Sequence, residues 1–212
     1  MAVISKVRIA NMALSFIGAK STIESLTEDS AEAKECNLWY DYSRLQTLST
    51  NDWSFARRRQ TLATHGDDPP DGIWAYRYVY PSDAVVLRKL ENPSGSALLA
   101  YYPDYSTFQA DAVPFSVEMS DDTTTKSILT DLNEAVAVYT FDQEQVNFFT
   151  PFFVEMLALQ IASRVGFALT GELDIVNTMV QRFIRMAAIA PAQDANERVG
   201  QPPRDADHIR GR

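Results

Sequence analysis

The chain has 212 residues, of which 46% are hydrophobic and 22% are charged. This much apolar material is enough for a packed core, so the chain is expected to fold. The formal net charge of -9 argues against a protein that grips DNA through clustered lysine and arginine side chains. An acidic surface that repels phosphate is still compatible with a role close to passing DNA.

Cysteine and histidine are scarce, which restricts metal and redox chemistry. Cys36 is the only cysteine, so an intrachain disulfide and a C-x-x-C site are excluded, which fits assembly in a reducing cytoplasm. His65 and His208 lie far apart in loop-like sequence, which makes a histidine zinc site or a Ser-His-Asp triad hard to build. We therefore expect no catalytic residues, no cofactor and no metal.

Membrane insertion is not expected either. The longest apolar stretch, around Phe152 to Leu169, is interrupted by Glu155, Gln160 and Arg164, and the first residues lack the continuous hydrophobic region of a signal peptide. The sequence predicts a soluble protein that is not processed and does not enter a membrane.

Two helices are predicted in residues 1–60, the N-terminal part of a helical core. The first runs from Val3 to Gly18, where apolar residues recur at steps of three and four, and glycine suits its C-terminal stop; the apolar positions are Val7, Ala10, Leu14 and Ile17. The second runs from about Glu28 to about Asn51, with Thr27 as its N-cap. Its apolar face is expected to hold Trp39, Tyr42, Leu45 and Leu48, and Trp53 and Phe55 to anchor its exit in the core.

A β domain is predicted in residues 61–148. A basic triplet, Arg57-Arg58-Arg59, precedes the boundary loop His65 to Gly72, which is too rich in turn-forming residues to be helical. Between Ile73 and Asp142 the residues alternate with the period of strands, and turn signals recur, as in a small antiparallel sheet or sandwich. The clearest alternation covers Trp74, Tyr76, Tyr78 and Tyr80, and then Val136 to Tyr139.

The remaining helices are predicted in residues 149–191. Thr150 and Pro151 form a start signal, and the following segment is apolar nearly all round, so it belongs at the centre of the helical layer. Thr170-Gly171 breaks it. The next helix carries a bundle-packing stripe and is expected to end at Pro191; the stripe comprises Leu173, Val176, Val180, Phe183 and Ala187. Residues 192–212 have almost no apolar content and form an extended tail. The fold class is therefore α+β, about four helices with an inserted antiparallel β domain.

Several motifs have both a functional and a structural interpretation, and the structural one is favoured for most of them. No phosphate-binding loop or nucleophile elbow occurs. Asp67-Asp68 and Asp121-Asp122 suit turn capping better than a hard cation. Cys36 suits a core position better than a nucleophile, and the Trp74 to Tyr80 aromatics suit a sheet core better than a binding platform. The arginine triplet is expected to pair with carboxylates, within the subunit or across a subunit boundary, rather than with phosphate. The tail fits either a partner-docking peptide or plain disorder.

The order and spacing of several short segments resemble the tail tubular protein A and head-to-tail adaptor family of tailed bacteriophages, especially T7-like podoviruses. Each segment alone is weakly specific, but together they span most of the chain. They are Asn11 to Gly18; Trp39 to Arg44 with Trp53 to Ala56; Tyr78 to Asp83; Ile128 to Asp131; and Pro151 to Phe153 with Ala158, Leu159 and Ala162.

The resemblance implies a structural, non-enzymatic subunit of a twelvefold homo-oligomeric ring in the virion neck, assembled in the host cytoplasm. The ring binds the portal protein above and a nozzle, or tail tubular protein B-like protein, below, and DNA passes through its channel without specific binding. The tail matches the family's portal-docking extension in position and character, which makes its arginine, proline and histidine residues expected portal contacts; these are Arg198, Pro202, Pro203, Arg204, His208, Arg210 and Arg212. The triplet Arg57, Arg58 and Arg59 is expected at subunit contacts.

Two other functions stay open at this point. One is a head-completion or tail-terminator protein of a long-tailed phage, which would share the helical core. The β insertion of about seventy residues is longer than a minimal helical connector needs, which favours the adaptor. The other is a tail-associated glycan hydrolase that uses two carboxylates of the β domain, although no pair of acidic residues stands out for that role.

Overall fold

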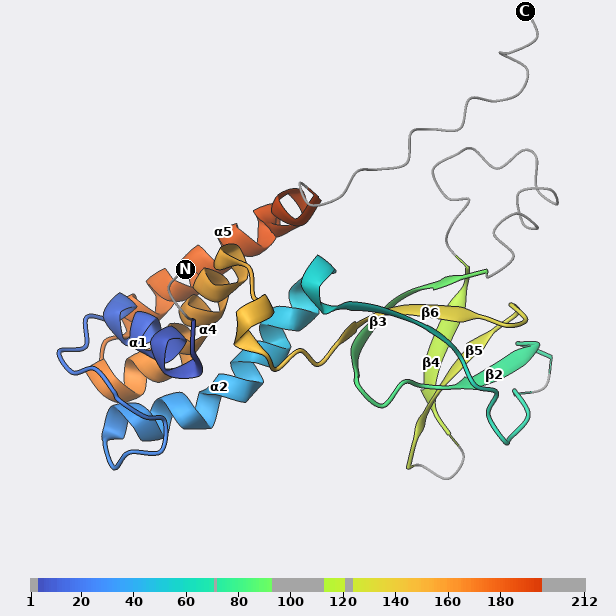
Figure 1. Cartoon of the computed structure of the whole chain (residues 1–212), viewed down its shortest axis with the longest axis horizontal. Helices are drawn as coiled ribbons and strands as arrows, with labels where there is room; N and C mark the ends of the chain where they lie inside the picture. Colours follow the sequence, from blue (N-terminus) through green and yellow to red (C-terminus); the bar gives the residue numbers. More distant parts are fainter. Residues whose placement is uncertain (1–3, 71, 93–112, 121–123, 196–212) are drawn as a thin grey trace, which may run out of the picture.

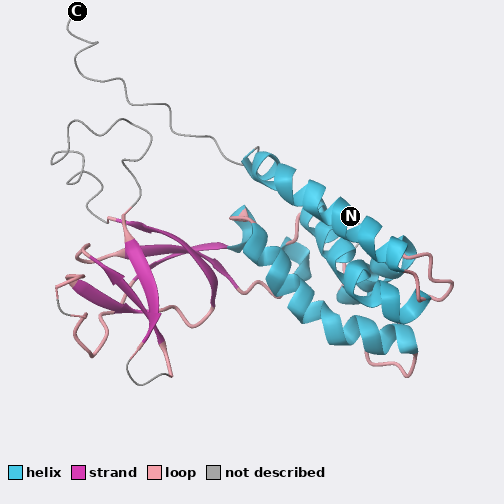
Figure 2. Ribbon diagram, turned by 180° about the vertical axis from the view of Figure 1, so that it is seen from behind, coloured by secondary structure: helices cyan, strands magenta, loops and turns pink. Residues whose placement is uncertain are grey.

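The computed structural model describes residues 4–70, 72–92, 113–120 and 124–195. Within these ranges the chain has a helical body at one end and a β module at the other (Figures 1 and 2). The helical body is built from α1 (Lys6–Phe16), α2 (Ala31–Thr50), α4 (Pro151–Thr170) and α5 (Leu173–Ala195). Because the β module follows α2 and precedes α4, it is an insertion between two helical pairs, which confirms the predicted α+β class.

The start of α2 differs from the prediction for a local reason. Ser30, not Thr27, is the N-cap, and its hydroxyl accepts a hydrogen bond from the amide of Ala33 at 3.2 Å. The Glu28 carboxylate accepts hydrogen bonds from the amides of Glu24 and Ser25 at 2.8 and 3.1 Å. These bonds hold the residues before Ser30 in a loop, so the helix begins only at Ala31.

The helix α4 lies at the centre of the helical body, as its apolar sequence predicts. Helices α1, α2 and α5 all pack against it. Thr150 caps it, with Pro151 in the first turn, and Gly171 ends it in the left-handed conformation at φ 71°. By length and composition α4 is apolar enough to cross a membrane, a property that a buried core helix shares.

The buried face of α2 is not the one expected from its large apolar residues. Leu48 is buried, but Trp39 and Leu45 are only partly buried and Tyr42 is exposed. The buried positions instead combine small, polar and aromatic residues, namely Ala33, Cys36, Tyr40, Ser43, Arg44, Thr47 and Leu48. Trp39 and Tyr42 flank this face, with their ring centroids 5.6 and 5.3 Å from the Arg164 guanidinium of α4.

The predicted packing stripe of α5 is only half correct. Val176, Phe183 and Ala187 turn partly inward, whereas Leu173 and Val180 are exposed. Met179 and Ala190 form the most buried positions instead. The packing face of α5 is therefore rotated by part of a turn from the predicted one, and it leaves apolar side chains on the outer surface.

Pro191 does not end α5, contrary to the prediction. The helix continues to Ala195 with Pro191 inside it. The last turn is anchored because a carboxylate oxygen of Asp194 accepts a hydrogen bond from the amide of Ser54 at 2.7 Å. An anchored turn retains its helical form although proline removes one backbone hydrogen bond.

The β module consists of two antiparallel sheets within the described residues. One has the order β1-β6-β3 and the other the order β2-β5-β4; the strands are β1 (Arg57–Thr61), β2 (Tyr76–Val79), β3 (Ala84–Glu91), β4 (Phe115–Met119), β5 (Lys126–Thr130) and β6 (Val136–Phe141). Buried residues of both sheets form one core, separate from that of the helices. The triplet lies in β1, so the β module begins earlier than residue 61.

The aromatic residues singled out in the sequence have structural positions. Tyr78 is buried in the β core, and its hydroxyl donates to the carbonyl of Leu132 at 2.8 Å. Trp53 is buried in the helical core, where Phe153 meets it edge to face at a centroid distance of 5.1 Å. The expectations that Tyr78 packs in the sheet core and that Trp53 anchors the exit of α2 are confirmed.

Candidate functional site

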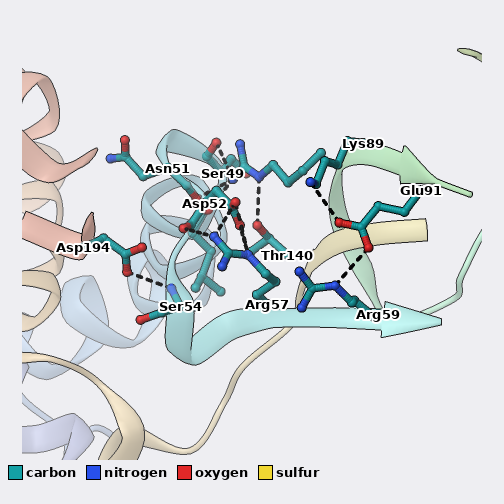
Figure 3. Close-up of polar contacts among 12 residues, drawn as sticks. Ser49, Asn51, Asp52, Ser54, Arg57, Arg59, Lys89, Glu91, Thr140 and Asp194 are labelled. Carbon is teal, nitrogen blue, oxygen red and sulfur yellow. Dashed lines mark hydrogen bonds and ion pairs between the residues drawn. The ribbon is translucent and has the colours of Figure 1, made fainter. Parts of the chain in front are cut away.

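A polar junction of charged side chains lies between the helical body and the β module, and Figure 3 shows the part of it around Arg57. It is defined here by Arg44, Arg57 and Arg88 with their partners. Arg88 and Arg57 join the end of α2, or the segment after it, to a strand. Arg44 joins the middle of α2 to the segment that follows β6.

Arg88 of β3 reaches across to the C-terminal end of α2. Its Nη2 donates to the carbonyls of Leu48 and Ser49, each at 3.1 Å, and to that of Asn51. Its Nε donates to the Thr140 hydroxyl of β6 at 2.9 Å. The last carbonyls of a helix have no partner inside the helix and carry the negative end of its dipole, so a guanidinium is a well-matched cap. Burial lowers the pKa of Arg88, while Asp52 opposes that effect.

Arg57 holds the turn that leads from α2 into β1. Its Nε donates to a carboxylate oxygen of Asp52 at 2.9 Å, and its Nη2 donates to the Asp52 carbonyl at 3.2 Å. Figure 3 shows this pair beside Ser54 and Asp194. The segment between α2 and β1 is thus bound to β1 through Arg57 and to the last turn of α5 through Asp194.

Arg44 makes a second connection from the middle of α2. It is buried, forms an ion pair with Asp142, and donates to the carbonyl of Gln143 at 2.9 Å. Burial by itself lowers the pKa of Arg44, but Asp142, Asp41 and Glu144 more than offset it, so the pKa lies above its ordinary value. The guanidinium therefore stays charged and joins α2 to the segment between β6 and α4.

The arginine triplet pairs with carboxylates inside the subunit. Arg58 forms an ion pair with Asp83, and Arg59 donates to Glu91 at 3.1 Å. Lys89 also contacts Glu91 at 2.8 Å, and together the two cations hold the pKa of Glu91 below its ordinary value although burial raises it. The pairing expected from the sequence is present, while a role of the triplet in subunit contacts stays a prediction.

The other residues named from the sequence divide into two groups. The expected portal contacts, Arg198, Pro202, Pro203, Arg204, His208, Arg210 and Arg212, lie outside the described residues, as do Asp121 and Asp122. Cys36 is buried in the helical core, and burial raises the pKa of its thiol to about 11. A thiol with that pKa stays protonated at neutral pH and has little nucleophilic character.

Sequence reasoning did not single out Arg44 and Arg88. A weak signal existed for Arg44, because it falls four residues from Tyr40 and from Leu48, both on the buried face. Arg88 carried no such signal, since its partners are mostly backbone carbonyls, which every residue possesses.

The contacts of the junction connect the helical body to the β module. The described residues contain no group of three or more histidine, cysteine or acidic side chains placed to hold a metal ion. The charged side chains of the junction are committed to one another, to helix carbonyls and to a loop carbonyl. Comparison with protein-family models and with curated proteins finds no match for this chain.

Proposed function

We propose that this protein is a structural head-to-tail adaptor of a tailed bacteriophage. It is a non-enzymatic subunit of a twelvefold ring in the virion neck, between the portal protein and a nozzle or tail tubular protein B-like protein. The sequence segments that resemble this adaptor family are the starting point of the proposal. The geometry of the polar junction is the observation that supports it.

An adaptor must hold two binding surfaces at a fixed distance and orientation. In this chain the helical body and the β module have separate cores, so a bare linker would let them move independently. The polar junction opposes that motion because Arg88 and Arg44 bridge the two parts on different strands and segments. Breaking either bridge leaves a buried or half-buried charge without its partners, which is costly. Fixed orientation is what a ring subunit between two neighbours requires.

The charge of the chain fits the same function. A subunit of net charge -9, repeated around a channel, surrounds passing DNA with negative potential. Phosphates then move through the channel without being held, whereas a DNA-binding surface would need clustered cations. The proposal therefore includes DNA passage without specific binding.

The direct test is to mix the purified chain with the portal protein encoded in the same genome and to image the complex by negative-stain microscopy. The proposal predicts an added ring of density on one end of the portal, with the portal's symmetry axis. The portal alone and the portal with an unrelated acidic protein of similar size are the controls. Portal particles that remain bare at saturating adaptor would contradict the proposed function.

A further inference from the structure

The outer side of α5 carries apolar side chains that the described part of the chain does not cover. Leu173, Val180 and Ile184 are 63%, 38% and 53% exposed. Their spacing of seven and four residues places them along one side of the helix. We call this row the α5 stripe. An exposed apolar row on a helix is typical of a surface that a partner covers.

The charge beside the α5 stripe is positive. Between residues 175 and 193 the only charged side chains are Arg182 and Arg185. Arg182 is held by Glu155 at 3.7 Å and lies over the Phe16 ring. Arg185 is exposed and forms no ion pair within the described residues. It is thus a cation that is available to a partner.

A second exposed apolar surface lies on α2, beside the acidic side chain of Glu35. Leu38 and Tyr42, one turn apart, are 66% and 53% exposed. Glu35, one turn before Leu38, forms no ion pair within the described residues, whereas Asp41 pairs with Lys6 and Arg44, and Lys34 pairs with Asp29. We call this surface the α2 patch. Helices α2 and α5 both pack on α4, and they run along opposite edges of the helical body (Figure 1). One copy therefore cannot bring its own stripe and patch together.

We propose that the α5 stripe of one copy packs on the α2 patch of the next copy, with Arg185 facing Glu35. The inference rests on the proposed ring, and it names the two surfaces that build it. Apolar side chains meet apolar side chains and opposite charges face each other, whereas an α5-to-α5 contact would bring two copies of Arg185 together. When two copies associate through two different surfaces, one stripe and one patch of the pair stay unoccupied and can bind further copies. Such heterologous contacts add further copies, and they close into a ring when the rotation between neighbouring copies is a whole fraction of a turn.

Two single variants of the full chain separate the two surfaces. Ile184→Glu places a carboxylate in the α5 stripe, and Leu38→Glu places one in the α2 patch. Sedimentation velocity at increasing concentration should show the unmodified chain associating beyond its monomer mass of 23.8 kDa. Each variant alone should associate at least about tenfold more weakly, because the interface would bury an unpaired charge.

A mixture of the two variants gives the sharpest result. The intact stripe of the Leu38→Glu chain fits the intact patch of the Ile184→Glu chain, but the two altered surfaces repel each other. The mixture should therefore form one-to-one dimers and nothing larger. Ile73→Glu is the matched control, since Ile73 is 68% exposed in the β module, and it should associate like the unmodified chain. Circular dichroism should give all three variants the unmodified helical content.

Two outcomes would overturn the inference. One is an unmodified chain that stays monomeric at the highest attainable concentration, and the other is a variant that associates as strongly as the unmodified chain. Portal binding separates this failure from failure of the proposed function. If the chain is monomeric but still decorates the portal, only the proposed stripe-to-patch contact is contradicted. If the chain forms a ring by itself but does not bind the portal, only the proposed adaptor function is contradicted.

Discussion

Arg88 shows how one side chain connects the two parts of the molecule without a carboxylate partner. Its guanidinium lies at the end of α2 and donates to the carbonyls of Leu48, Ser49 and Asn51, while its Nε holds Thr140. The planar group presents several donors in a fixed geometry. A lysine has the same charge, but its single ammonium group cannot donate hydrogen bonds to the helix end and to the strand hydroxyl at the same time.

Replacing Arg88 should therefore destabilise the whole fold. Arg88→Met is expected to lower the free energy of unfolding by about 2 kcal/mol, because several acceptors lose their donor. Arg88→Lys should recover less than half of that loss. Arg59→Met is the matched control, since Arg59 is exposed, and it should cost less than about 1 kcal/mol. Urea unfolding followed by circular dichroism measures all three. Equal losses for Arg88→Met and Arg59→Met would contradict a capping role.

The arginines also mark where prediction from sequence stops. The sequence indicated that the triplet pairs with carboxylates, because acidic residues are abundant, and Arg57, Arg58 and Arg59 do so. It did not indicate which carboxylates, since Asp83 and Glu91 are brought to the triplet only by strand pairing. Arg88 was missed because backbone carbonyls have no residue signature.

At the level of elements, the start of α2 depends on an ionised side chain. The Glu28 carboxylate accepts hydrogen bonds from the amides of Glu24 and Ser25 and from the Ser30 hydroxyl. Those bonds lower the pKa of Glu28 from its ordinary value of 4.5, with the Glu24 amide as the largest cause. The ionised form is thus the one that holds the loop before the helix.

This loop should make part of the stability dependent on pH. A carboxyl whose pKa is lower in the folded state stabilises the fold above its unfolded pKa, and that contribution is lost as pH falls through the folded pKa. Glu28→Gln should therefore have a lower urea midpoint than the unmodified chain at pH 7. The difference should shrink below about pH 4.5 and vanish in stronger acid. A difference that is constant from pH 7 to pH 3 would contradict the role of the charge.

The end of α5 depends on a contact far away in sequence. Asp194 is buried in the last turn of α5, beyond Pro191, and its carboxylate accepts a hydrogen bond from the amide of Ser54. This turn therefore belongs to the folded body. A truncation designed from sequence alone, at residue 192, would remove it.

Two truncations should consequently behave differently. Removing residues 196–212 should leave the melting temperature within about 2 °C, because it takes away none of the described contacts. Removing residues 192–212 also deletes Asp194 and should lower the melting temperature by roughly 3 to 8 °C, from the loss of a charged hydrogen bond. Asp194→Ala in the full chain should reproduce most of that drop in a thermal melt. Two truncations of equal stability would contradict the anchoring of the last turn.

Element positions were largely predictable, whereas the orientation of two helices was not. The Thr150-Pro151 start and the Gly171 stop lie where local chemistry placed them. The predicted packing stripe of α5 was only half correct, because apolar spacing indicates a face that avoids water without showing whether the same chain or another covers it. Leu173 and Val180 fit the helical period and still face outward.

For the whole molecule, the polar junction, the two exposed helix surfaces and the net charge have complementary roles in the proposed ring. The junction fixes the β module relative to the helices. The α5 stripe and the α2 patch form the proposed contact between neighbouring copies. The charge of -9 per subunit then disfavours retention of DNA.

The assembled protein should not retard duplex DNA in a gel at low salt, where non-specific binding is strongest. Retardation that disappears with added salt would contradict the proposed passage of DNA without binding.

The proposed attachment to the portal depends on residues 196–212, where all the expected contacts lie. The boundary at Ala195 makes this segment separable, because the last helical turn and its Asp194 anchor are retained. A chain ending at Ala195 should keep the unmodified circular dichroism spectrum and the unmodified self-association, since the stripe and the patch are intact. It should fail to decorate the portal in negative-stain images, because the arginines and prolines that resemble a docking extension are gone. Replacing only Arg198, Arg204, Arg210 and Arg212 by glutamine in the full chain should weaken decoration strongly. If the truncated chain still binds the portal, docking belongs to the described body and the predicted portal contacts are wrong.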